Sequence, residues 1–90
     1  KVLIVEDHES MREMLKLAFE KERYKYDAVD TGEEGYKKAQ ALKYDVIILD
    51  LMLPEKSGFD VIKQLRALKN NTPIIVISAR MDEADKVRAL

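Results

Sequence analysis

Three short runs of consecutive aliphatic residues constrain this sequence more than any other feature. They are Val2 to Val5, Val46 to Leu49 and Ile74 to Ile77. Strands that are apolar at every position are buried on both faces, which is typical of a parallel sheet covered by helices on both sides. A fourth run, Tyr26 to Val29, is interrupted by Asp27 and is typical of an edge strand. The chain is therefore expected to form a parallel sheet of four strands.

Between these runs, the apolar residues recur with the spacing of amphipathic helices. The first helix has an apolar stripe at Met11, Met14, Leu15, Ala18 and Phe19. This stripe is predicted to lie in the core, with Arg12 on the opposite face of the helix. The apolar residues predicted to be buried by the later helices are Tyr36, Ala39 and Leu42, then Phe59, Ile62, Leu65 and Leu68, and finally Ala84 and Val87.

A residue that can cap a helix begins each of these segments, with an acidic residue three positions further on. The pairs are Ser10 with Glu13, Thr31 with Glu34, Ser57 with Asp60, and Asp82 with Asp85. Four strands that each precede a helix imply right-handed crossovers and a doubly wound sheet. The predicted fold class is α/β, and residues 1–90 are expected to form one domain.

The composition excludes several classes of function. Lys and Arg total 16 and Asp and Glu total 17, which gives a net charge of −1, and the basic residues are scattered rather than clustered as in a nucleic-acid-binding surface. Because the sequence has no cysteine, it has no disulfide, thiolate zinc site or Cys nucleophile. No apolar run approaches the roughly 18–20 residues of a membrane span. A cytoplasmic domain without membrane or direct nucleic-acid contact is expected.

Acidic residues follow two of the predicted buried strands. Open parallel sheets bind ligands at the carboxyl ends of their strands, where the strand order reverses. In the flavodoxin-like order 2-1-3-4 the first and third strands are neighbours, about 4.8 Å apart, which brings Glu6, Asp7 and Asp50 into one pocket. Carboxylates this close repel one another, and a divalent cation relieves the repulsion. Mg²⁺ suits such a set of carboxylates, so the sequence predicts a magnesium site.

The residues after Asp50 predict how its side chain is presented. Pro54 fixes the backbone angle φ, Ser57 can cap the next helix, and Gly58 permits a close approach of the backbone. Such a loop would hold the Asp50 carboxylate beside the metal and pointing outward.

Two donors follow the fourth strand, the Ser78 hydroxyl and the Ala79 backbone N–H. Both are expected to meet an oxyanion placed on Asp50. A carboxylate nucleophile beside Mg²⁺ and flanked by donors suits the acceptance of a phosphoryl group as an acyl phosphate.

In their order and spacing, these motifs resemble the receiver domain of two-component response regulators. The motifs are the pair Glu6-Asp7, the loop from Asp50 through Pro54 to Gly58, and the pair Ser78-Ala79. The resemblance extends over residues 1–90, the first four βα units of a fold that normally has five. The stretch around Met52 and Arg80 is most similar to receivers attached to winged-helix transcription factors.

The resemblance implies a role for each matching residue. Asp50 would accept a phosphoryl group from a sensor histidine kinase, with Mg²⁺ bound by Glu6, Asp7, Asp50 and the backbone carbonyl of Met52. Ser78 would be the switch hydroxyl, and Ala79 would contact the phosphoryl group. A signalling domain of this kind is not an enzyme, because it promotes only the phosphorylation and dephosphorylation of its own Asp. A C-terminal DNA-binding output domain is implied as well.

The sequence departs from the family pattern in having no position for the fifth strand and its phosphoryl-contacting Lys. Without that neighbour, the strand Ile74 to Ile77 would be an open sheet edge, a template for pairing with another chain. The chain, which begins at Lys1, is therefore expected to be a piece of a longer protein or a fragment that associates as a homodimer or swapped assembly. The alternative function is thus an engineered or truncated α/β fragment that self-associates through this edge.

Met52, His8 and Lys56 are near the predicted site, but their residue types do not indicate one particular role. The remaining alternative is a phosphatase or phosphotransferase that uses an Asp nucleophile and Mg²⁺. Such enzymes usually have a second acid two residues after the nucleophile, and Met52 stands there instead. His8 is expected to be exposed in the loop after the acidic pair. Lys56 is expected to be a solvated loop charge, with contact to a phosphoryl oxygen as the less favoured interpretation.

Overall fold

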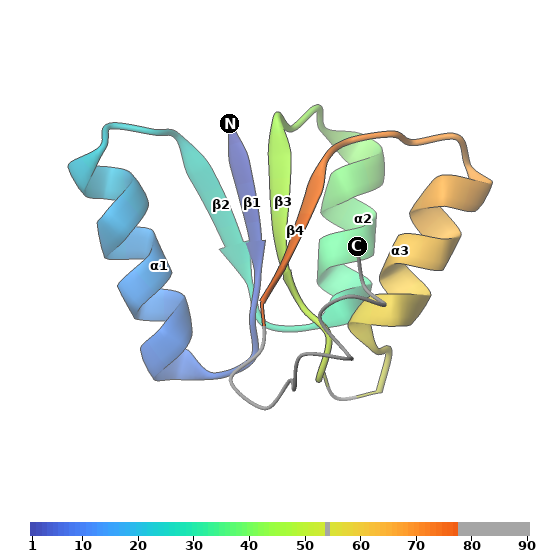
Figure 1. Cartoon of the computed structure of the whole chain (residues 1–90), viewed down its shortest axis with the longest axis horizontal. Helices are drawn as coiled ribbons and strands as arrows, with labels where there is room; N and C mark the ends of the chain where they lie inside the picture. The colour runs from blue at the N-terminus through green and yellow to red at the C-terminus, as the bar shows by residue number, and fades with distance from the viewer. Residues whose placement is uncertain (54, 78–90) are drawn as a thin grey trace.

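The structure is a computed structural model that describes residues 1–53 and 55–77 (Figure 1). Its elements are β1 (Val2–Val5), α1 (Glu9–Lys21), β2 (Tyr26–Val29), α2 (Gly32–Ala41), β3 (Val46–Asp50), α3 (Gly58–Ala67) and β4 (Ile74–Ile77). The four strands and first three helices therefore occur where the sequence predicts them. Pro54, Ser78, Ala79 and the helix predicted from Asp82 lie outside the described residues.

The sheet has the predicted topology. All its strand pairs are parallel, and the strand order is β2-β1-β3-β4. β1 and β3 run side by side in register, from Val2 beside Val46 to Val5 beside Leu49. Because the two strands are level at their carboxyl ends, the residues that follow them emerge at the same edge of the sheet.

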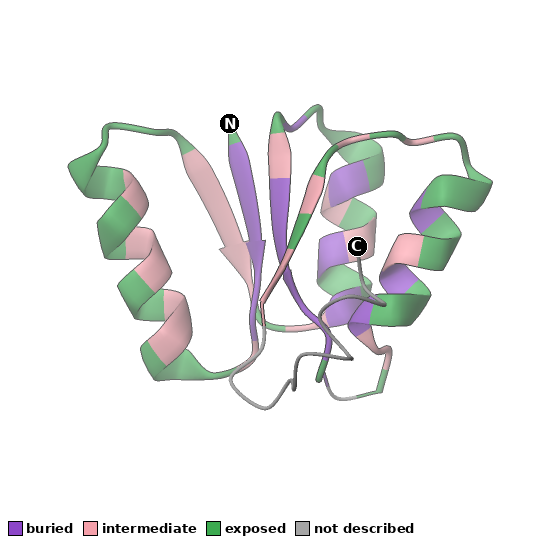
Figure 2. Ribbon diagram, viewed as in Figure 1, coloured by how far each residue is buried: buried purple, intermediate pink, exposed green. Residues whose placement is uncertain are grey.

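Helices cover both faces of the sheet, with α1 on one side and α2 and α3 on the other (Figure 1). The larger core lies under α2 and α3 and contains Leu3 and Val5 of β1, whereas Val2 and Ile4 belong to the smaller core under α1. Figure 2 shows the buried positions concentrated in β1, β3 and the inner sides of α2 and α3. The central strands are thus buried on both faces, as predicted.

The strand β4 is less buried than its sequence predicts. Its residues are half-buried or exposed within the described part of the chain, and Ile75 is 53% exposed. The physical reason is its position, because β4 pairs with β3 alone among the described strands and lies at the edge of the sheet.

Helix α1 corrects two of the predictions. It has no buried residue, and Met14 is 56% exposed, so its methionine stripe is not core. Leu15 and Phe19 of the stripe are partly buried and pack against the smaller core. The helix begins at Glu9 with His8 as its N-cap residue, which places Ser10 inside the helix rather than at its cap. Among the described elements, α1 is the only helix on its side of the sheet. A single helix buries only the narrow stripe of residues that contacts the strands.

Helices α2 and α3 begin at the predicted caps. The Thr31 hydroxyl oxygen accepts a hydrogen bond from the backbone N–H of Glu34, at 3.1 Å. The Ser57 hydroxyl oxygen likewise accepts one from the backbone N–H of Asp60, at 3.3 Å. Each bond satisfies an N–H group that a helix start otherwise leaves without an intrahelical partner.

The buried faces of these two helices were predicted only in part. α3 buries Val61 and Leu65, whereas Phe59 and Leu68 are exposed. In α2 Ala39 is buried, but Leu42 is exposed at the C-cap. The exposed residues lie at or beside helix ends, since α3 spans Gly58–Ala67 and α2 ends at Ala41.

A polar contact joins β2 to the segment before β3. The Tyr44 hydroxyl donates a hydrogen bond to Asp27 Oδ2 at 2.5 Å, and Lys1 Nζ lies 3.2 Å from the same oxygen. The hydrogen bond from Tyr44 and the charge of Lys1 lower the pKa of Asp27 below its ordinary value. Burial and the hydrogen bond to Asp27 raise the pKa of Tyr44.

We expect Tyr44→Phe to lower the free energy of unfolding by about 1–2 kcal/mol at neutral pH, because the carboxylate loses a hydrogen-bond donor. Since the folded pKa of Asp27 is depressed, its stabilisation is present above the ordinary pKa of 3.8 and is lost as pH falls through the folded value. Urea unfolding at neutral and acidic pH should show the difference shrinking in acid. An equal loss at both pH values would assign the effect to ring packing instead.

Candidate functional site

Four side chains meet at the carboxyl edge of the sheet. Glu6, Asp7 and His8 follow β1, and Asp50 is the last residue of β3. Each offers one ligand atom, and these four atoms all lie within 4.8 Å of one another. The structure therefore brings together the three carboxylates as predicted. It also places the imidazole of His8 beside them, which was not predicted.

Two of the carboxylates are almost completely buried. Glu6 and Asp50 are each 2% exposed. Burial and the neighbouring Asp50 carboxyl raise the pKa of Glu6, against the opposing effect of the His8 backbone N–H that donates to it at 3.0 Å. Two buried acids this close cannot both ionise cheaply unless a positive charge joins them.

The environment of the Asp7 carboxylate indicates whether a cation fits the cluster. Its Oδ1 atom is buried and accepts no hydrogen bond from the described residues, although His8 Nδ1 lies 3.3 Å away. A buried carboxylate oxygen without a donor is costly in a protein interior. Divalent cations such as Mg²⁺ bind oxygen ligands of this kind, so the donor set fits a hard divalent ion.

The loop after β3 fixes the Asp50 side chain. The backbone N–H of Met52 donates a hydrogen bond to Asp50 Oδ1 at 3.0 Å, and the N–H of Gly58 donates one to the Leu51 carbonyl at 3.1 Å. A side chain on Gly58 would place its Cβ 2.5 Å from the Asp50 carbonyl oxygen and 2.6 Å from the Leu51 Cα. The close approach predicted for Gly58 is thereby confirmed, since only glycine fits there.

We expect Gly58→Ala to displace this loop and to destabilise the fold by about 1–3 kcal/mol, because the new methyl group meets backbone atoms that cannot move aside cheaply. Thermal unfolding and NMR chemical shifts of Asp50 and Met52 would measure both effects. Ala67→Gly, at the other end of α3, is a control that changes helix propensity without touching the loop. Unchanged stability and shifts in Gly58→Ala would contradict the close packing.

Arg12 holds the acidic pair from α1, a role that the sequence interpretation missed. Its Nη1 donates a hydrogen bond to the Glu6 carbonyl at 3.0 Å and lies 3.5 Å from the Asp7 carbonyl. Helical periodicity assigned Arg12 to the face opposite the apolar stripe. The available signal was its place in the first turn after the acidic pair, from which a long side chain can reach back over the preceding loop.

His8 is the second residue that the sequence interpretation left out. Its side chain is 54% exposed, as expected, yet its Nδ1 lies 3.4 Å from Glu6 Oε2 as well as close to Asp7. The loop turns His8 back over the residues that precede it. Its proximity to the carboxylates depends on this turn, which composition and spacing do not reveal.

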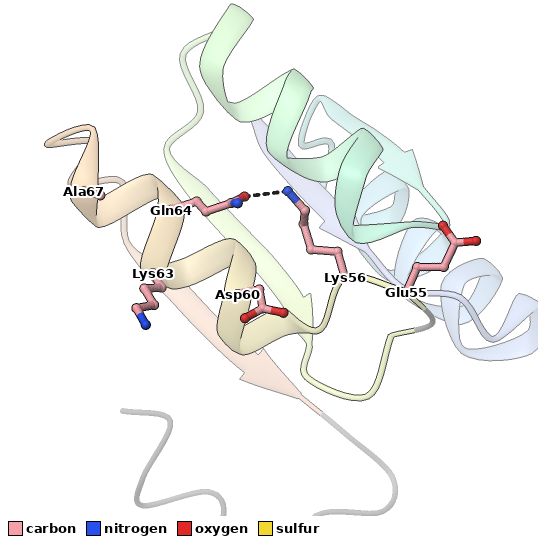
Figure 3. Close-up of a pocket in the computed structure, with 6 residues that line it drawn as sticks. All are labelled: Glu55, Lys56, Asp60, Lys63, Gln64 and Ala67. Carbon is pink, nitrogen blue, oxygen red and sulfur yellow. Dashed lines mark hydrogen bonds between the residues drawn. The ribbon is translucent and has the colours of Figure 1, made fainter.

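Lys56 is not the solvated charge that was expected. Its Nζ donates a hydrogen bond to Gln64 Oε1 at 2.5 Å, pairs with Glu33 Oε2 at 3.0 Å and lies 4.6 Å from the centre of the Tyr36 ring. Figure 3 shows this hydrogen bond among the residues that line a groove, which are Glu55, Lys56, Asp60, Lys63, Gln64 and Ala67. The groove has a volume of about 510 Å³. These contacts engage the ammonium group with α2 and α3, and the groove contains no residue of the acidic cluster.

Comparison with known proteins identifies the class to which this fold and site belong. Residues 2–90 match the family described as the response regulator receiver domain. The chain belongs to this family, and it is a receiver domain of the two-component response-regulator type, a signalling domain.

Several transcriptional regulators are similar over nearly the whole chain. The response regulator ArlR of Staphylococcus saprophyticus is 42% identical over 90 residues, and the transcriptional regulatory protein ResD of Bacillus subtilis is 39% identical over 88 residues. These matches cover 100% and 98% of this chain but 40% and 36% of the two relatives. The chain thus spans well under half the length of these relatives.

Solved structures agree with the fold. The receiver domain of the Francisella response regulator 1452 has a TM-score of 0.89 at 30% identity, over 97% of this chain and 72% of that one. The receiver domain of the Pseudomonas aeruginosa sensor histidine kinase PA1611 has a TM-score of 0.89 at 26% identity, over 99% of this chain and 77% of that one. The latter structure has a magnesium ion coordinated in its active-site cleft.

Hydropathy adds one observation about the helices. In the described ranges, none is both long enough and apolar enough to cross a membrane.

Proposed function

We propose that Asp50 is the phosphoacceptor of this domain and that Glu6, Asp7, Asp50 and the backbone carbonyl of Met52 hold Mg²⁺ beside it. The observation that carries the proposal is the convergence of the carboxylates within 4.8 Å at the carboxyl edge of the sheet. The buried Asp7 Oδ1, which accepts no hydrogen bond from residues 1–53 and 55–77, supports the cation, and the family match supports the phosphoryl chemistry.

The proposed reaction is the transfer of a phosphoryl group from a phosphohistidine of a sensor kinase. An Asp50 oxygen attacks phosphorus, the O–P bond forms as the N–P bond breaks, and the leaving imidazole takes the bonding electron pair and a proton. The hydrogen bond from the Met52 N–H to Asp50 Oδ1 fixes the orientation of the attacking carboxylate. When bound, Mg²⁺ neutralises charge on the phosphoryl oxygens.

The remaining roles follow from the family resemblance. Ser78 is proposed as the switch hydroxyl and Ala79 as a phosphoryl contact, both beyond the described residues. The domain acts only on its own Asp, so it is a signalling module rather than an enzyme with external turnover. Residues 1–90 are proposed to be a cytoplasmic receiver domain, and similarity to transcriptional regulatory proteins supports a C-terminal winged-helix, DNA-binding output domain.

We expect Asp50→Asn to abolish labelling by acetyl phosphate and Mg²⁺, because the amide is not a nucleophile for phosphorus. Intact mass spectrometry would detect the added phosphoryl group, and circular dichroism would check the fold. Asp45→Asn is the matched control, since Asp45 is exposed and lies before β3, at the opposite end of the strand. Equal labelling of the Asp50→Asn variant and the wild-type protein would rule out Asp50 as the acceptor.

Self-association is the second candidate function, and one observation favours it. Among the described strands β4 pairs only with β3, and Ile75 on this strand is 53% exposed. An apolar strand at an open edge can pair with a second copy of the chain.

If β4 mediates association, Ile75→Lys should shift the protein toward monomer, because a charge at the sheet edge opposes pairing. Sedimentation equilibrium over a concentration series measures the effect. Met14→Lys, which adds the same charge on exposed α1, is the control. A wild-type protein that stays monomeric throughout the series would exclude this function.

A further inference from the structure

We propose that His8 is a nitrogen ligand of the acidic site, which makes the site selective for first-row transition ions such as Co²⁺ and Ni²⁺ over Mg²⁺. The inference rests on the proposed metal site and adds a residue to it. None of the roles assigned above requires His8, and its neighbours Glu6 and Asp7 are the predicted ligands.

The position of the imidazole suits a shared ion. His8 Nδ1 lies 3.4 Å from Glu6 Oε2 and 3.3 Å from Asp7 Oδ1. In an octahedral site with bonds of about 2.1 Å, neighbouring ligand atoms are about 3.0 Å apart and opposite ones about 4.2 Å apart. The four candidate atoms span at most 4.8 Å, so a contraction of well under an ångström closes the site.

The backbone of His8 is held on both sides. Its N–H donates to Glu6 Oε2 at 3.0 Å, and its carbonyl accepts from the Arg12 N–H at 2.9 Å in the first turn of α1. The imidazole therefore reaches the site by side-chain rotation alone. Because the ring is 54% exposed, an ion from solvent can reach it before the buried carboxylates.

The chemistry of the donor set determines which ions respond to His8. Mg²⁺ prefers oxygen ligands and keeps several of its waters, so an imidazole adds little to its binding. Neutral imidazole is a good ligand for Co²⁺, Ni²⁺ and Zn²⁺, whose affinities also follow the Irving–Williams order. The buried Asp7 Oδ1, which lacks a hydrogen bond within the described part of the chain, provides a neighbouring oxygen ligand for the same ion.

The test compares Mg²⁺ and Co²⁺ binding by calorimetry to wild type, His8→Ala and Glu9→Ala on the full chain. His8→Ala is expected to weaken Co²⁺ binding about tenfold or more, since loss of even an outer-shell partner costs metal sites about 10–100-fold. Its Mg²⁺ affinity should stay within about twofold of wild type. The control Glu9→Ala removes a neighbouring exposed charge and should affect both ions alike.

Electron paramagnetic resonance of bound Cu²⁺, for which imidazole is a good ligand, provides a second readout. Wild type should show coupling to an imidazole nitrogen, and His8→Ala should lose it. Unchanged Co²⁺ affinity in His8→Ala, an equal loss for both ions, or no nitrogen coupling in wild type would each overturn the proposal. If His8 alone is wrongly assigned, Mg²⁺ binding and acetyl phosphate labelling of Asp50 persist, whereas failure of the metal site itself removes Mg²⁺ binding as well.

Discussion

The burial of two carboxyl groups at the ends of adjacent strands is the constraint on which the site depends. Glu6 and Asp50 are each 2% exposed, and they are close enough for Asp50 to raise the pKa of Glu6. Such an arrangement opposes folding unless protons or a cation balance the charge. The cluster of carboxylates is therefore the direct consequence of the parallel pairing of β1 with β3, which ends both strands at one edge of the sheet.

The rest of the described chain holds these acids in place. The loop after β3 packs so closely on the start of α3 that Gly58 has no room for a side chain, and the Met52 N–H fixes one Asp50 oxygen. From the other side of the sheet, the Arg12 guanidinium binds the Glu6 carbonyl. Rigid support from both layers keeps the carboxylates from moving apart to relieve their repulsion, which is the preorganisation that metal and phosphoryl chemistry need.

The features that depend on local sequence pattern and on sheet topology were predicted correctly. The strands, the caps at Thr31 and Ser57 and the meeting of Glu6 with Asp50 all follow from local pattern and sheet topology. Predictions failed where the burial of a helix residue depends on which other elements cover the same face of the sheet. Met14 has the spacing of a core residue but is exposed, because α1 makes only a narrow contact with its face of the sheet.

The order and spacing of the motifs were enough to predict the receiver family, and the apolar runs with helical segments between them were enough to predict a parallel sheet, because few arrangements bury such strands. The polar side chains that lie beside Glu6 and Asp7 could be identified only from the three-dimensional contacts. Arg12 and His8 reach them through a turn of the chain after β1, and Lys56 turns toward α2 and α3 instead. Long polar side chains have several rotamers of similar energy, so their direction is set by partners distant in sequence or across a turn.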